Sequence, residues 1–215
     1  MKVKSVLLDL DGTLLDSLTT VYHAVSTAIR ELNLPPLTRK QIKDNVHNSV
    51  EGAFLQTYPE HSDKLEAFRR SFTAHYLRNF KKTTRIIPGS IETLRSLRRR
   101  GVKIGIVTSR TKSFAGRMLE YFKIPYDVLL ARDDTVNGRP DPEPLERAMN
   151  CLHSRPSETI YVGDTPYDIE QGKRAHVTTI GVSSGLHTRQ ELAAQHPDFL
   201  IGSVDELSET VGFTG

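Results

Sequence analysis

The chain has 215 residues, of which 37% are hydrophobic and 26% are charged, and its formal net charge is +3. This composition is typical of a folded globular chain and excludes a wholly disordered one. No stretch approaches the roughly 18 unbroken apolar residues of a membrane helix, and the short apolar run at the N-terminus does not resemble a signal peptide. The single cysteine, Cys151, allows no internal disulfide, so we expect a cytoplasmic protein without a membrane partner.

The basic residues do not indicate a nucleic-acid partner. The densest basic cluster lies in residues 95–100 and is followed by Gly101. Cations before a glycine are typical of the C-terminal end of a helix. Neither interleaved aromatic residues nor a zinc-finger spacing accompanies the cluster, so we expect no binding of nucleic acid.

Short apolar runs alternate with helical patterns along most of the chain. The first strand is predicted at residues 3–10, directly before the turn formed by Asp11 and Gly12. Strands separated by helices of about ten residues predict an α/β fold, with a Rossmann-like parallel sheet covered by helices on both faces. Further strands are predicted at residues 102–107, 127–130, 159–162, 177–182 and 198–201, and helices at 90–100, 112–122, 142–151 and 166–175.

One segment interrupts this alternation. Between residues 18 and 85 the sequence shows helical patterns, at 21–32 and 65–80, but no run typical of a strand. We interpret the segment as a small α-helical cap domain inserted after the first strand. Residues 1–17 and 86–215 then form the core domain.

Two carboxylates follow the first predicted strand. Asp9 and Asp11 flank Leu10 at its C-terminal end, where ligands of open α/β sheets bind. Carboxylates this close together repel each other unless a cation or a proton intervenes. The alternative is an ordinary turn, because Asp-Gly is a common turn dipeptide.

Polar residues also follow two later elements of the predicted sheet. Thr108 and Ser109 end the second long strand and are suited to hold a phosphate oxygen, although residues of this kind before a helix are more often an ordinary N-cap. Arg139 lies in a polar loop, where an arginine is more often solvated than functional. Asp164 follows the strand at 159–162 at the place of a metal ligand, whereas Asp168 has a structural explanation in a capping box with Thr165.

The ordered segments DLDGTLLDS, IVTSR, GRPDPEP and VGDTPYD resemble the four motifs of the haloacid dehalogenase-like hydrolase superfamily. The place of the insertion resembles the helical-cap subfamily that includes phosphoglycolate phosphatases and β-phosphoglucomutase. This resemblance implies that Asp9 is the nucleophile and Asp11 the general acid and base. It also implies that Asp9, Asp11 and Asp164 hold Mg²⁺, and that Thr108 and the Ser109 backbone bind the transferring phosphoryl group.

The third motif departs from the family pattern. The family has a lysine before the proline, and this chain has Arg139, which keeps the charge but is not geometrically equivalent. The resemblance implies that Arg139 binds the substrate phosphate and that Asp168 supports the site. The presence of Asp11 argues against the dehalogenase and phosphonate-cleaving branches, which lack an acid at this position.

The resemblance therefore implies a magnesium-dependent phosphatase that hydrolyses a small phosphorylated metabolite through an aspartyl-phosphate. A sugar-phosphate mutase is the nearest alternative, and a non-catalytic phosphate-binding relative is a more distant one. The mutases carry a basic residue in a cap loop, and the corresponding stretch here, residues 44–54, has no lysine or arginine. Within it, His47 and Asn48 are candidates for substrate specificity. The identity of the substrate and the oligomeric state stay open.

Overall fold

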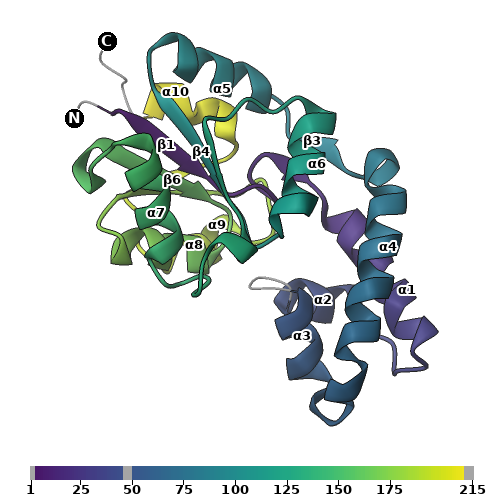
Figure 1. Ribbon diagram of the computed structural model, residues 1–215. Coiled ribbons are helices and arrows are strands. Elements are labelled where there is room, and N and C mark those ends of the chain that lie inside the picture. The colour runs from purple at the N-terminus through teal and green to yellow at the C-terminus, as the bar shows by residue number, and fades with distance from the viewer. Residues whose placement is uncertain (1–2, 46–49, 211–215) are drawn as a thin grey trace. The chain divides into compact units, whose positions relative to one another are not determined.

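The computed structural model describes residues 3–45 and 50–210 of the chain. The chain divides into two compact units. A core unit comprises Met1–Leu15 and Ile86–Gly215, and a cap unit comprises Asp16–Arg85. The chain passes between the units along two short strands, β2 (Leu15–Asp16) and β3 (Arg85–Ile86), which pair in a two-stranded sheet (Figure 1).

The core unit is built on a six-stranded sheet in the order β5-β4-β1-β6-β7-β8, and all of its neighbouring strands pair in parallel. All four residues of the central strand β1 are buried, as expected when helices cover both faces of a parallel sheet. The predicted α/β fold is confirmed. The strands are β1 (Ser5–Leu8), β4 (Lys103–Val107), β5 (Val128–Leu130), β6 (Thr159–Gly163), β7 (Thr178–Val182) and β8 (Phe199–Ile201).

The helices of the core unit alternate with these strands along the chain. Basic residues end α5, and Gly101 follows with a φ of +77°, as the sequence predicts for this helix end. The short helices α9 and α10 have no counterpart in the sequence prediction. The helices are α5 (Ser90–Arg99), α6 (Lys112–Phe122), α7 (Glu143–Leu152), α8 (Pro166–Arg174), α9 (Arg189–Ala193) and α10 (Leu207–Thr210).

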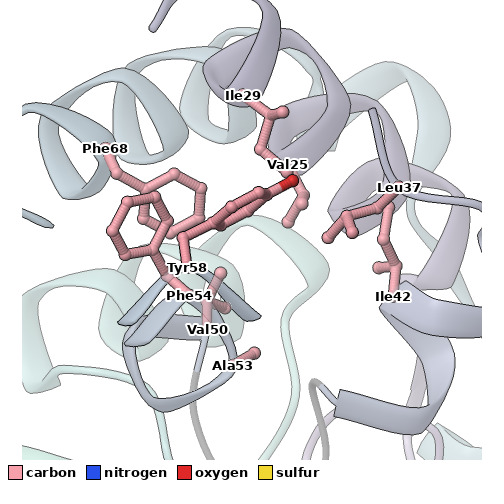
Figure 2. Close-up of a pocket in the computed structure, with 9 residues that line it drawn as sticks. All are labelled: Val25, Ile29, Leu37, Ile42, Val50, Ala53, Phe54, Tyr58 and Phe68. Atoms are coloured by element: carbon pink, nitrogen blue, oxygen red, sulfur yellow. The ribbon is translucent and has the colours of Figure 1, made fainter. Parts of the chain in front are cut away.

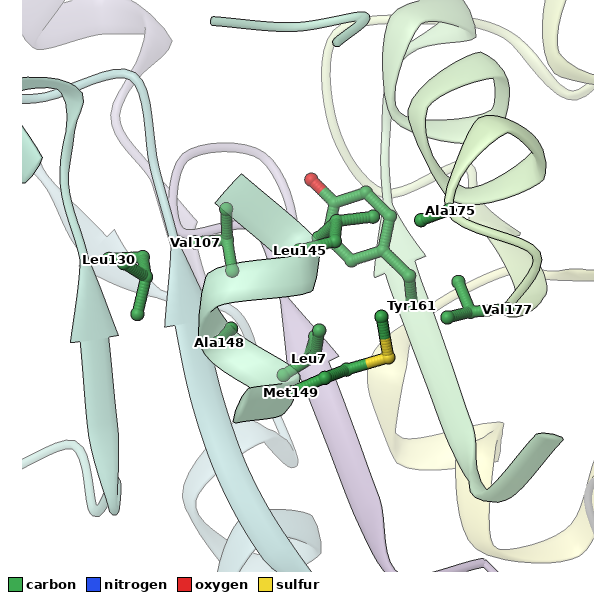
Figure 3. Packing of buried hydrophobic residues seen from close by; sticks show 9 residues of the cluster. All are labelled: Leu7, Val107, Leu130, Leu145, Ala148, Met149, Tyr161, Ala175 and Val177. Carbon is green, nitrogen blue, oxygen red and sulfur yellow. The ribbon is translucent and has the colours of Figure 1, made fainter. Parts of the chain in front are cut away.

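A cluster of buried apolar side chains joins α7 to the sheet. Leu145, Ala148 and Met149 recur at helical spacing and therefore share one face of α7. Figure 3 shows this face turned toward side chains of the sheet, among them Leu7 and Tyr161. The burial of this face fixes α7 on the sheet, and with it the loop that carries the third motif just before the helix.

Apart from Asp16 in β2 and Arg85 in β3, the regular secondary structure of the cap unit consists of helices over its described residues. Its two long helices, α1 and α4, pack against each other, and the fourth helix carries a row of aromatic rings on its buried face. Figure 2 shows a small apolar pocket inside the cap, where the rings of Phe54, Tyr58 and Phe68 lie close together. The elements are α1 (Leu18–Glu31), α2 (Arg39–Asn45), α3 (Val50–Thr57), η1 (Pro59–Lys64) and α4 (Leu65–Thr83).

We find no helix in the described ranges that has both the length and the apolar character needed to cross a membrane.

Candidate active site

Three buried carboxylates meet at the carboxyl edge of the sheet. Asp9 directly follows β1, Asp164 directly follows β6, and Asp168 lies in the first turn of α8. Each offers an oxygen, and these oxygens all lie within 4.8 Å of one another. The backbone N–H of Asp9 donates to the Val162 carbonyl oxygen at 3.0 Å, which holds the ends of the two strands together.

Asp9 is the least satisfied of these carboxylates. Its exposed fraction is 2%, and its Oδ1 has no hydrogen-bond partner among the residues that the structure describes. Burial raises the pKa of Asp9 well above its usual value, and the neighbouring aspartates raise it further. Arg139 opposes this shift, with its Nη2 at 3.5 Å from Asp9 Oδ1. The carboxylate is thus poised to accept a proton or a cation.

Asp164 is held by a loop as well as by its own strand. Its Oδ2 accepts a hydrogen bond from the backbone N–H of Leu186 at 2.7 Å, and its Oδ1 accepts one from Thr13 Oγ1 at 3.4 Å. Burial and the charge of Asp168 raise the pKa of Asp164 to about 7. A Cβ added at Gly12 or at Gly185 would lie 2.1 Å from Asp164 Oδ2, so both glycines are required for the close approach of their loops.

Asp168 performs the structural task that the sequence predicts for it. It forms a capping box with Thr165 at the start of α8, and the Thr165 backbone N–H donates to its Oδ2 at 3.0 Å. Its Oδ1 accepts hydrogen bonds from Tyr161 Oη at 2.7 Å and from Arg139 Nη1 at 2.5 Å. Asp168 therefore fixes the guanidinium of Arg139.

The idea that Arg139 is a solvated loop residue is wrong. Its side chain is only 8% exposed, and its guanidinium spans Asp168 on one side and Asp9 on the other. Burial alone would lower the pKa of Arg139, but the two carboxylates outweigh it and hold the pKa well above its usual value. A permanent positive charge thus faces Asp9 from inside the protein.

Thr108 and Ser109 follow β4, the sheet neighbour of β1. Thr108 is buried, and its backbone N–H donates to the Leu130 carbonyl oxygen at 2.9 Å. The alternative that these residues cap the following helix is wrong, because α6 begins at Lys112 with Thr111 as its N-cap. Thr108 instead accepts a hydrogen bond at Oγ1 from the backbone N–H of Arg110 at 3.3 Å.

Arg110 belongs to the site, although no role for it was predicted from the sequence. Its Nη2 donates to Asp11 Oδ1 at 2.8 Å, and its Nε donates to Asp11 Oδ2 at 2.5 Å. The signal available in the sequence was its position, next to Thr108 and Ser109 in the same loop. His47 and Asn48, the candidates for substrate specificity, lie outside the described residues.

Comparison with known proteins identifies the family of this chain. The family model for haloacid dehalogenase-like hydrolases matches residues 6–182. Pyrophosphatase PpaX of Halalkalibacterium halodurans is 31% identical over 215 residues, which are 99% of this chain and 98% of that protein. Pyrophosphatase PpaX of Anoxybacillus flavithermus is 29% identical over 217 residues, covering 100% and 99%.

Solved structures agree with the sequence comparisons. A haloacid dehalogenase-like hydrolase from Bacteroides fragilis matches with a TM-score of 0.88 and 27% identity, over 96% of this chain and 100% of that chain. The predicted membership is confirmed: the chain belongs to the haloacid dehalogenase-like hydrolase family.

Proposed function

We propose that this protein is a magnesium-dependent phosphatase that hydrolyses a small phosphorylated metabolite through an aspartyl-phosphate on Asp9. That the chain is a phosphatase of the haloacid dehalogenase-like type agrees with its family and its full-length relatives. The observation that carries the mechanism is the setting of Asp9, a buried carboxylate with an unsatisfied oxygen beside the Arg139 guanidinium.

The carboxylates of the site suit a hard divalent cation. Mg²⁺ prefers oxygen ligands, and the buried oxygens of Asp9 and Asp164 lie close together in a setting that raises the pKa of both groups. The main-chain carbonyl of Asp11 would complete the protein's share of the ligands. When bound, Mg²⁺ would offset the repulsion between these carboxylates and an anionic substrate.

In the first chemical step a carboxylate oxygen of Asp9 attacks phosphorus, and the bond from phosphorus to the leaving oxygen breaks. The electron pair of that bond stays on the leaving oxygen, and Asp11, protonated at the start of this step, gives its proton to that oxygen. Arg139 and Thr108 would bind the oxygens of the transferring group, on which charge accumulates. Because Asp168 already fixes Arg139, little reorganisation is needed at this moment.

In the second step a water molecule attacks the phosphorus of the aspartyl-phosphate. Asp11 takes the proton of the water, and the bond from phosphorus to Asp9 breaks, with the electron pair returning to the carboxylate. Inorganic phosphate leaves, and both aspartates are back in their starting states. The same two residues thus serve both halves of the reaction.

Inorganic pyrophosphate is the first substrate to test, because relatives that span the whole chain are named pyrophosphatases. Phosphate release should be measured on pyrophosphate, phosphoglycolate, a sugar phosphate and a nucleoside monophosphate, each in magnesium and in EDTA. We expect release that EDTA abolishes and magnesium restores. Full activity after exhaustive treatment with EDTA would contradict a magnesium-dependent mechanism, and no release from any substrate would contradict a phosphatase.

A further inference from the structure

The pair formed by Arg110 and Asp11 occupies both oxygens of the proposed general acid. The guanidinium donates from two nitrogens to the two carboxylate oxygens, in the bidentate geometry that arginine forms with carboxylates and phosphates. The side chains are 11% and 26% exposed, so the pair is largely shielded from solvent. In this arrangement both oxygens of Asp11 are engaged by Arg110.

In addition to its contact with Asp11, Arg110 is held at its backbone and at its guanidinium. Its backbone N–H donates to Thr108 Oγ1, and its carbonyl oxygen accepts a hydrogen bond from the Arg132 backbone N–H at 2.8 Å. The guanidinium lies over the ring of Phe114, with its carbon 4.7 Å from the ring centroid. The donors are therefore held at one place beside Asp11 and next to the loop proposed to bind the phosphoryl group.

The pair must open when Asp11 acts on a leaving oxygen. A leaving group that carries its own negative charge can open it, because its oxygens compete for the same N–H donors and match their spacing. A neutral leaving group offers the guanidinium no such exchange. Asp11 must come within hydrogen-bond distance of the leaving oxygen, and Arg110 lies beside Asp11. A negative charge one or two atoms beyond the leaving oxygen, in the leaving group, is therefore within reach of Arg110.

We infer that Arg110 determines specificity by binding an anionic leaving group in place of Asp11. The ligand class is a phosphate or carboxylate group borne by the leaving part of the substrate, and the second phosphate of pyrophosphate fits it. This inference rests on the proposed function, and it assigns the selection of substrates to a residue of the core unit. By exchanging one anion for another, Arg110 releases the Asp11 carboxylate only when such a substrate is present, and the released carboxylate takes up from solvent the proton that it then gives to the leaving oxygen.

The test compares two substrates in Arg110→Gln, Arg110→Lys and the control Arg132→Gln. Arg132 is a neighbouring arginine whose loss removes the same charge. For pyrophosphate, kcat/KM should fall on the order of 10²-fold in Arg110→Gln and about tenfold in Arg110→Lys. For glycerol 2-phosphate, whose leaving group is neutral, kcat/KM should not fall in Arg110→Gln and should rise, because the substitution removes the contact that engages Asp11. Arg132→Gln should stay within about twofold of wild type on both substrates.

A binding measurement keeps this inference separate from the proposed chemistry. In magnesium, calorimetry should show that wild type binds methylenediphosphonate, which cannot be hydrolysed, more tightly than orthophosphate, and that Arg110→Gln removes this preference. Equal fractional losses of kcat/KM on both substrates, or a preference for the diphosphonate that survives in Arg110→Gln, would overturn the inference. If the proposed phosphatase function is wrong, wild type should release no phosphate but should still prefer the diphosphonate.

Discussion

Arg139 and Asp168 form a buried ion pair in which the carboxylate fixes the arginine that faces the nucleophile. The guanidinium donates through Nη1 to Asp168 Oδ1, and its Nη2 lies 3.5 Å from Asp9 Oδ1. The loop that carries Arg139 is joined in this way to α8, because Asp168 lies in the first turn of that helix and forms its capping box. The pair lets one side chain neutralise two carboxylates.

Arg139→Ala should cost several kcal/mol of transition-state stabilisation, on the scale of losing a preorganised charged donor. It should also destabilise the fold by about 3–5 kcal/mol, because it leaves Asp9 and Asp168 buried without their cation. Arg139→Lys should retain more of the activity and more of the stability, since it keeps a charge that can reach one carboxylate at a time. Kinetics and urea unfolding of the two variants measure these effects. A fully active Arg139→Ala would rule out this role for the residue.

Asp9→Asn should lower turnover by a factor on the order of 10⁴ or more, because an amide cannot attack phosphorus. The same variant should be more stable than wild type at neutral pH in EDTA. Because folding raises the pKa of Asp9, this residue costs folding free energy at neutral pH, and a neutral amide avoids that cost. Thermal unfolding in EDTA and a phosphate-release assay together check the prediction. A stable variant that retains substantial activity would contradict nucleophilic attack by Asp9.

The stability of the metal-free protein should fall as the pH rises from about 4 to about 7. The pKa of Asp164 is raised from 3.8 to about 7 in the fold. Between these values the folded state binds more protons than the unfolded state, so stability is lost as the pH rises through the folded pKa. Asp9 is shifted in the same direction. Magnesium should raise the midpoint of thermal unfolding more at high pH than at low pH, and a shift independent of pH would contradict this linkage.

Gly185→Ala should weaken magnesium binding about tenfold or more by displacing a proposed ligand. The new Cβ would lie 2.1 Å from Asp164 Oδ2, the oxygen that the Leu186 N–H holds. The matched control is Gly116→Ala within α6, where nothing lies within 4 Å of an added Cβ. That control should gain about 0.5–1 kcal/mol of stability and keep its response to magnesium. Titration of magnesium against thermal unfolding compares the two, and equal responses would show that the contact with Asp164 is unimportant.

The fold was predictable from the sequence because each element has a strong local signal. Six apolar runs of strand length became the strands of the sheet. The helices between them have a clear apolar face, of which α7 is an example. The weak run at residues 198–201 became the edge strand β8. The pairing of β2 with β3 was not predictable, because two residues in each strand carry no periodic pattern.

The site was only partly predictable, because its contacts join distant parts of the chain. The order of the motifs predicts that Asp9 and Asp164 lie close together at the carboxyl edge of the sheet. The capping box of Asp168 can be recognised from local spacing. The burial of Arg139 could not be foreseen from a polar loop, since it depends on a carboxylate 29 positions away. The bidentate contact of Arg110 with Asp11 spans 99 positions and depends on the two side-chain conformations.

The covalent intermediate on Asp9 is the central claim, and acid-quench trapping during the first turnover tests it most directly. Enzyme and substrate are mixed in magnesium, quenched in acid and digested, and the peptides are mapped by mass spectrometry. Asp11→Asn is included with p-nitrophenyl phosphate, whose leaving oxygen needs little protonation, because loss of the general base should then slow hydrolysis of the intermediate more than its formation and increase its amount. We expect a phosphorylated Asp9, from which hydroxylamine releases the phosphate, and no phosphorylated residue in Asp9→Asn. Product formation without phosphorylated protein, or a phosphate on another residue, would contradict the proposed mechanism.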